Sequence, residues 1–173
     1  MLFRSFSGCN VTLPYKEAAL HVCDRVDSAA RRIGAVNTIV VADDGTLEGS
    51  CTDGFGFMQA LKEGAPGLNL SGARTLLVGA GGSAKAIAVS LIEAGISELI
   101  IVNRTRSRAE NLSINLDGEV AVLDWDQRSE RLDEIHLLVN STTLGMQGQP
   151  QLDLELDALP RDAIVMDAVY TPL

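Results

Sequence analysis

Residues 75–84 read Thr75-Leu76-Leu77-Val78-Gly79-Ala80-Gly81-Gly82-Ser83-Ala84, and this stretch decides the fold. Its short, unbroken apolar run is typical of a strand that is buried on both faces of a parallel sheet. Gly79, Gly81 and Ala84 then match the G-x-G-x-x-G/A fingerprint of a dinucleotide site. The glycines permit a tight turn, and the N-terminus of the helix that follows offers N–H groups to a pyrophosphate. Without its flanks, the same stretch is also compatible with a tight strand-to-helix turn that binds nothing.

Strand and helix patterns alternate from residue 70 onward. Strands are expected at 74–78, 98–102, 119–123, 135–140 and 163–169, and helices at 82–94 and 105–113. Such alternation predicts right-handed βαβ units and a parallel, doubly wound sheet. The fold class is therefore α/β, with a Rossmann-type domain over residues 70–173.

Residues 1–69 predict part of a smaller α/β domain. A strand near 8–13 ends in a turn, helices are expected from about 15 to 22 and from 28 to 33, a β-hairpin over 35–51, and a further helix from 52 through Lys62. Asp43-Asp44-Gly45 is the turn signal of the hairpin. Gly64-Ala65-Pro66-Gly67 breaks the last helix and marks the expected boundary between the two domains.

Composition excludes several classes of protein. The formal net charge of −9 argues against nucleic-acid and membrane-surface partners, which need a basic face. Cys9, Cys23 and Cys51 are odd in number and form no C-x-x-C pair, so neither a disulfide framework nor a zinc site is predicted. His21 and His136 stand apart and form no metal-ligand pattern. We expect a cytoplasmic protein with no metal and no membrane-spanning segment.

The end of the second Rossmann strand predicts which dinucleotide is bound. An NAD site usually places Asp or Glu about 20 residues after the glycines, where it holds the ribose 2′-hydroxyl. Here the strand is followed by Asn103, Arg104 and Thr105, with Arg106 and Arg108 close behind. A guanidinium pairs with a 2′-phosphate, whereas a carboxylate repels it. The predicted cofactor is NADP; the alternative is a solvated, basic first helical turn.

Two further polar loops follow apolar strands. Residues 140–146 come after the strand at 135–139, and residues 167–172 follow the last strand. In an open α/β sheet such loops line the ligand crevice, although each is also compatible with an ordinary connection.

Lys16 and Asp53 stand next to predicted helix starts in the first domain. A lysine–aspartate pair in a cleft can move a proton during carbonyl reduction, because the developing alkoxide needs a proton donor or a positive neighbour. Charge pattern alone favours two unrelated surface charges.

A series of motifs resembles those of shikimate dehydrogenases, in the same order and over nearly the whole chain. They are Asn10-Val11-Thr12-Leu13-Pro14-Tyr15-Lys16, Gly34-Ala35-Val36-Asn37-Thr38, Thr52-Asp53-Gly54-Phe55-Gly56, Gly79-Ala80-Gly81-Gly82, Asn103-Arg104-Thr105, Asn140-Ser141-Thr142-Thr143-Leu144-Gly145-Met146 and Asp167-Ala168-Val169-Tyr170-Thr171-Pro172. Together they are far more specific than any one of them.

The resemblance implies NADPH-dependent reduction of 3-dehydroshikimate to shikimate, a step of aromatic amino-acid biosynthesis, by a monomer or homodimer. It makes Lys16 the proton donor, with Asp53 orienting it and binding a substrate hydroxyl. Thr12 and Asn37 are implied to hold substrate hydroxyls, and Tyr170 to contact the substrate. The implied cofactor residues are Gly79, Ala80, Gly81, Gly82 and Ser83 at the pyrophosphate, Ala168 at the nicotinamide end, and Asn103, Arg104, Thr105 and Arg108 around the 2′-phosphate.

The chain departs from the family pattern in three places. Only nine residues precede Asn10, so the family's first strand and its S-x-S motif are missing, and Ser5-Phe6-Ser7 is in the wrong place to replace it. The chain ends three residues after Tyr170, before the family's G-x-x-M-L-x-x-Q helix. Cys51 replaces the usual Asn before T-D-G, and a thiol is the poorer hydrogen-bonding group. These departures predict a fragment of a shikimate dehydrogenase, and they put the activity of this chain by itself in doubt.

Three alternatives stay open. The same fold could act on quinate or on a broader range of substrates. Glutamyl-tRNA reductase also reads G-A-G and then N-R-T, but the three cysteines do not sit in its catalytic motif. A non-catalytic NADP-binding module is the alternative from a different class.

Overall fold

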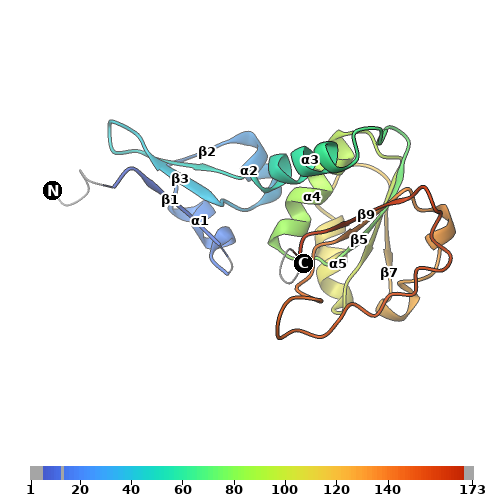
Figure 1. The fold of residues 1–173 in the computed structure, drawn as a ribbon. Coiled ribbons are helices and arrows are strands. Elements are labelled where there is room, and N and C mark those ends of the chain that lie inside the picture. Colours follow the sequence, from blue (N-terminus) through green and yellow to red (C-terminus); the bar gives the residue numbers. More distant parts are fainter. Residues whose placement is uncertain (1–5, 13, 170–173) are drawn as a thin grey trace. The chain divides into compact units, whose positions relative to one another are not determined.

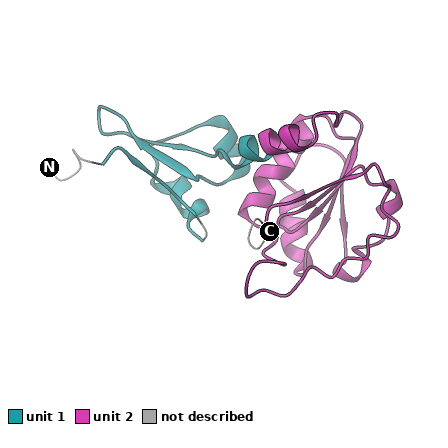
Figure 2. Cartoon of the chain, viewed as in Figure 1, with its two compact units in different colours: residues 1–57 teal, residues 58–173 magenta. Residues whose placement is uncertain are grey.

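The computed structural model describes residues 6–12 and 14–169. The chain forms two compact units, residues 1–57 and 58–173, which are coloured separately in Figure 2 and described separately below. The change from one unit to the other falls inside α3 (Asp53–Gly64), whereas the sequence placed it after residue 69. The helix runs unbroken through Phe57, so no loop marks this change.

The first unit is built on a four-stranded sheet of mixed direction, in the order β1-β3-β4-β2. Its strands are β1 (Gly8–Asn10), β2 (Arg25–Val26), β3 (Thr38–Val41) and β4 (Leu47–Ser50). The pairs β1–β3 and β3–β4 are antiparallel, and β2 runs parallel to β4. The hairpin expected over residues 35–51 is confirmed as β3 and β4, whereas the two-residue strand β2 was not anticipated.

Two short helices accompany this sheet, α1 (Lys16–Val22) and α2 (Ser28–Ile33), close to their expected positions. Helix α2 is capped at both ends. The Asp27 side chain accepts a hydrogen bond from the Ala30 N–H at 2.6 Å, and Gly34, at φ 71°, donates its N–H to the Ala30 carbonyl. A left-handed residue at this position favours glycine, so the sequence signal for the helix end was physically specific.

The second unit is a five-stranded parallel sheet in the order β7-β6-β5-β8-β9, which confirms the expected Rossmann-type fold. Its strands are β5 (Arg74–Val78), β6 (Glu98–Val102), β7 (Val120–Leu123), β8 (Leu137–Asn140) and β9 (Ile164–Asp167). The strand order reverses between β5 and β8, and this reversal places a ligand crevice at the carboxyl ends of these strands.

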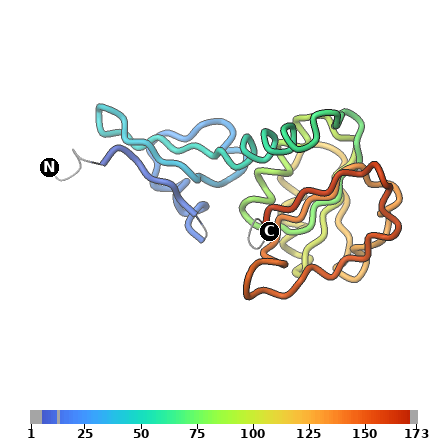
Figure 3. Tube along the Cα trace, viewed as in Figure 1, coloured from blue at the N-terminus to red at the C-terminus, as the bar shows by residue number. Residues whose placement is uncertain are grey.

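The two faces of this sheet are covered differently (Figure 1). Helices α4 (Gly82–Glu93) and α5 (Arg106–Ser113) form right-handed crossovers on one face. The other face carries the 3₁₀ turns η1 (Trp125–Gln127) and η2 (Leu132–Glu134) and the long connection from β8 to β9, whose path is followed in Figure 3. The apolar cluster on this side consists of Leu76, Val78, Ile100, Val102, Leu132, Ile135 and Leu138, with Trp125, Leu152, Leu154 and Leu159 packed against it.

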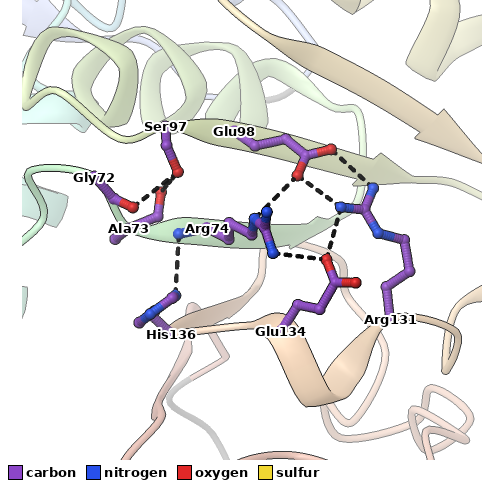
Figure 4. Close-up of polar contacts among 8 residues, drawn as sticks. All are labelled: Gly72, Ala73, Arg74, Ser97, Glu98, Arg131, Glu134 and His136. Atoms are coloured by element: carbon purple, nitrogen blue, oxygen red, sulfur yellow. Dashed lines mark hydrogen bonds and ion pairs between the residues drawn. The ribbon is translucent and has the colours of Figure 1, made fainter.

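An ion-pair network ties together the amino ends of the central strands (Figure 4). Arg131 donates to both carboxylate oxygens of Glu98, at 2.8 and 2.7 Å, and to Glu134 at 2.9 Å. Arg74 reaches Glu134 at 2.9 Å. Hydrogen bonds from Arg131 lower the pKa of Glu98, and they outweigh the opposing effect of burial. Arg131 has φ 63°, the only positive φ among the described non-glycine residues.

Among the described residues, no helix combines the length and the apolar character needed to cross a membrane. No group of three or more histidine, cysteine, aspartate or glutamate side chains among them is arranged to hold a metal ion.

Candidate functional site

The first unit brings Lys16 and Asp53 into contact. Lys16 begins α1 and Asp53 begins α3, so each side chain projects from the first turn of a helix. The Lys16 ammonium donates a hydrogen bond to Asp53 Oδ2, and Lys16 as a whole is only 8% exposed. Charge pattern alone favoured two separate surface charges, but the fold makes them one largely buried pair, and buried lysines are rare unless paired.

Asn37 holds the other oxygen of this carboxylate. Its Nδ2 donates to Asp53 Oδ1 at 2.6 Å and to Thr52 Oγ1 at 3.0 Å, while its Oδ1 accepts the Thr52 N–H at 3.0 Å. The backbone of Asn37 is also held on both sides, by the Val11 N–H at 2.7 Å and by the Ser50 carbonyl at 3.0 Å. Both oxygens of Asp53 therefore have a donor, which fixes the orientation of the carboxylate toward Lys16.

Cys51 precedes Thr52 and Asp53 in the chain and is buried. It is 8% exposed, and its sulfur receives a hydrogen bond from the Asp53 N–H. Burial raises the pKa of the thiol and is the largest influence on it, ahead of that hydrogen bond, which lowers the pKa. The effect of the thiol on this loop, which the sequence placed in doubt, stays a prediction.

Thr12 and Tyr170 complete the substrate residues expected from the sequence. Thr12 is exposed in the turn before α1, where its carbonyl accepts the Tyr15 N–H at 2.9 Å. Tyr170 lies outside the described residues, so its expected contact with the substrate stays a prediction.

In the second unit, the glycine turn joins β5 to α4. Gly79 has φ 114°, and a β-carbon there would lie 2.5 Å from Ser141 Oγ, so only glycine fits. Gly81 is the N-cap of α4 and has no side chain with which to cap the helix. A β-carbon added to Gly81 would meet no atom within 4 Å. The open space over Gly81 and the uncapped helix start leave room and N–H donors for an anion. Ala80, Gly82 and Ser83 belong to the same turn.

The residues after β6 divide into paired and unpaired cations. Arg106 is held by Glu110 and by Asp124, each at 2.7 Å. Arg104 and Arg108 are exposed, and in the described part of the chain neither has a carboxylate partner. The Asn103 side chain donates to the Thr105 carbonyl at 2.8 Å and shapes the loop between them. On a chain of net charge −9, these two exposed guanidinium groups are thus available to pair with an anion.

Asn140, the last residue of β8, is a residue to which the sequence assigned no role of its own. Asn140 is 2% exposed and hydrogen-bonds to Asp167 at 3.0 Å, and its carbonyl accepts the Ala168 N–H at 2.9 Å. The signal that could have identified it is a buried polar residue ending an otherwise apolar strand.

The chain matches known protein families over most of its length. Residues 2–39 match the family described as shikimate dehydrogenase substrate binding domain, and residues 60–146 match the family described as shikimate/quinate 5-dehydrogenase. The shikimate dehydrogenase (NADP(+)) of Paramagnetospirillum magneticum is 50% identical over 168 residues, which cover 97% of this chain and 61% of that protein.

Solved structures agree with these matches. Quinate dehydrogenase from Corynebacterium glutamicum in complex with NAD superposes with a TM-score of 0.89 at 34% identity, over 99% of this chain and 62% of that one. Shikimate 5-dehydrogenase from Thermus thermophilus in complex with NADP(H) and shikimate has a TM-score of 0.81 at 39% identity, over 98% and 61%. This chain thus spans about three fifths of the length of its relatives.

Proposed function

We propose a function from the premise that this chain belongs to the shikimate/quinate 5-dehydrogenase family, whose model matches half of it. The function is NADPH-dependent reduction of 3-dehydroshikimate to shikimate, carried out by the protein of which these residues are the catalytic and cofactor-binding part. The observation that carries the proposal is the buried Lys16–Asp53 pair oriented by Asn37.

Lys16 handles the proton in this proposal. The hydride comes from NADPH and is added to the carbonyl carbon, and the carbonyl oxygen then needs a proton. The Lys16 ammonium supplies that proton, or stabilises the charge that develops on the oxygen. Asp53 keeps the ammonium oriented and, with Thr12, is available to substrate hydroxyls. Asn37 orients Asp53, and family resemblance assigns it to a substrate hydroxyl as well. Tyr170 is assigned to the substrate by family resemblance.

The residues of the second unit fit NADP. Gly79, Ala80, Gly81, Gly82 and Ser83 would hold the pyrophosphate; Asn103, Arg104, Thr105 and Arg108 would surround the 2′-phosphate; Ala168 would lie at the nicotinamide end. The fit is supported by the open space over Gly81 and by the free guanidinium groups of Arg104 and Arg108.

The cofactor assignment is tested by replacing single arginines. Arg104→Ala and Arg108→Ala should each weaken NADPH binding by about tenfold or more, since a charge-assisted hydrogen bond contributes roughly 1.5–3 kcal/mol. Neither should change NADH binding. Arg106→Ala is the matched control, because its guanidinium is already engaged by Glu110 and Asp124. Equal losses in all three variants would refute the assignment.

The chemistry is tested by following NADPH oxidation with 3-dehydroshikimate. The assay compares the 173-residue chain with a chimera completed at both ends by the Paramagnetospirillum magneticum relative. Lys16→Ala in the active form should lower turnover by about 10²–10⁴-fold while leaving NADPH affinity nearly intact. Lys62→Ala, which removes an exposed lysine of α3, is the control. An inactive chimera would refute the assigned reaction, and an unaffected Lys16→Ala variant would favour a binding module.

Quinate is the second candidate substrate. It is favoured by the likeness to the quinate dehydrogenase of Corynebacterium glutamicum, which was solved with NAD. Turnover of shikimate and of quinate with each dinucleotide separates the two, and preference for quinate with NAD would overturn the first assignment.

The proposal also places the protein in the cytoplasm as a monomer or homodimer. The free thiols Cys9, Cys23 and Cys51 fit a reducing compartment. Light scattering on the purified chain decides between the two assemblies.

A further inference from the structure

Asn140 is buried at the carboxyl end of β8, and its side chain is fully engaged. Its Nδ2 donates to the Leu144 carbonyl at 3.3 Å and to Asp167 Oδ1 at 3.0 Å. Its Oδ1 accepts from the Thr142 N–H at 3.0 Å and from Thr142 Oγ1 at 2.7 Å. Both donors and both acceptor positions of this buried amide are satisfied. The amide therefore holds its partners in one arrangement, because loss of any partner leaves a buried polar group unpaired.

The first loop that Asn140 fastens packs against the glycine turn. Ser141 donates its N–H and its hydroxyl to the Val78 carbonyl, at 2.8 and 2.9 Å. A β-carbon on Gly79 would lie 2.5 Å from Ser141 Oγ and 3.0 Å from Thr142 Cγ2. The position of residues 141–142 therefore bounds the glycine turn on its β8 side.

The second segment that Asn140 fastens follows β9. Asp167 Oδ1 accepts the Asn140 amide and also the Val169 N–H at 2.8 Å. The Asn140 carbonyl accepts the Ala168 N–H at 2.9 Å. The Asn140 side chain thus connects residues 141–144, which pack against the glycine turn, to residues 167–169, which include Ala168.

The loop after β6 is outside this network. Among the residues that the structure describes, no hydrogen bond or ion pair joins Asn103, Arg104 or Arg108 to residues 140–144 or 167–169. The Asn140 network and the free arginines are thus separate parts of the strand-end crevice, so they can be perturbed one at a time.

We infer that Asn140 is a positioning residue for the nicotinamide half of the cofactor: it sets the spacing of three segments, the glycine turn, residues 141–144 and residues 167–169. The inference rests on the proposed function, since it presumes that NADPH binds in this crevice. It assigns Asn140 no contact with cofactor or substrate. Asn140 affects NADPH binding only through the positions of these three segments.

Two probes distinguish a positioning role from general destabilisation. NADPH occupies the whole crevice, whereas adenosine 2′-monophosphate carries only the adenosine end and its 2′-phosphate and has no phosphate at the glycine turn. Calorimetric titration of the intact chain should show that Asn140→Ala weakens NADPH binding by about tenfold or more and changes adenosine 2′-monophosphate binding by less than about twofold. Equal losses for both probes, or no loss for NADPH, would overturn the inference.

Two further variants complete the experiment. Asn115→Ala removes an exposed asparagine hydrogen bond at the end of α5, so it should leave both affinities unchanged. Asp167→Ala removes only the β9 half of the network at an exposed position, and it should give the same selective loss even where Asn140→Ala does not fold. Failure of the unsubstituted chain to bind NADPH would refute the proposed function itself, which is a different result from unselective loss in the variants.

Discussion

Replacing Arg131 by alanine or by glycine removes the same guanidinium, but only glycine suits the backbone at this position. Arg131 has φ 63°, in the left-handed region. Alanine retains the steric cost of that conformation, about 1–2 kcal/mol, and glycine does not. The two variants therefore separate the ion pair from the backbone strain.

The size of the effect follows from the environment of each contact. The bonds to Glu98 are short, paired and partly screened from solvent, because the Glu98 side chain is 14% exposed. The contact with Glu134, 37% exposed, adds little. We expect Arg131→Ala to lower the free energy of unfolding by about 2–3 kcal/mol. Arg131→Gly should lower the free energy of unfolding by about 1 kcal/mol less than Arg131→Ala does. Glycine removes the backbone strain, but part of this gain is lost because glycine is more flexible in the unfolded chain.

The assay is urea unfolding followed by tryptophan fluorescence. The chain has one tryptophan, Trp125, and it lies in the unit that contains Arg131. The signal therefore reports the Rossmann-type unit by itself. A glycine variant less stable than the alanine variant would refute the argument from strain. A double-mutant cycle with Glu98→Gln that gives a coupling energy near zero would refute the argument from the ion pair.

The Glu98–Arg131 ion pair predicts that the stability of the fold depends on pH. The pKa of Glu98 is lowered in the folded chain, so its contribution to stability is fully present above the unfolded carboxyl value, about 4.3. It is lost as the pH falls through the folded pKa. The stability difference between the unsubstituted chain and Glu98→Gln should therefore shrink below about pH 4. A difference that is constant from about pH 7 to about pH 3 would contradict this.

Three other predictions concern single side chains. Thr75 is fully buried and its hydroxyl has no partner within the described structure, so Thr75→Val should raise stability by about 1 kcal/mol in the urea assay; a loss would contradict it. Gly79→Ala should destabilise the fold, whereas Gly81→Ala should leave its stability nearly unchanged and weaken NADPH binding in titrations. Equal thermal stability of the two variants would refute the steric argument. Iodoacetamide should alkylate exposed Cys9 well before buried Cys51, as peptide mass spectrometry would show, and equal rates would contradict the burial.

Elements whose signals are local could be predicted from the sequence. The short apolar run before Gly79 indicated a doubly buried strand entering a tight turn, and the structure has it there. The hairpin around Gly45, at φ 88°, and the helix ending at Gly34 follow from the same kind of local constraint. The alternation from β5 through α5 predicted right-handed crossovers in a parallel sheet, and the observed order β7-β6-β5 agrees with them.

The covering of the second sheet face was not predictable in this way. Residues 124–136 and 141–163, on either side of β8, contain only the two 3₁₀ turns η1 and η2 where a doubly wound fold usually has helices. Their apolar residues are spaced irregularly, so periodicity indicates no element. What places Leu132 and Leu154 is contact with the strands, which is a property of the assembled layers.

By itself the sequence determined the βαβ order, the glycine turn and the basic strand end, because each depends on residues within one turn or one strand. Only the tertiary structure decided that Lys16 and Asp53, 37 positions apart, form one buried pair. It also decided that Arg106 is neutralised by Asp124 while Arg104 is not. Charge pairing depends on distance in space, and that distance is set by how strands and helices pack rather than by spacing along the chain.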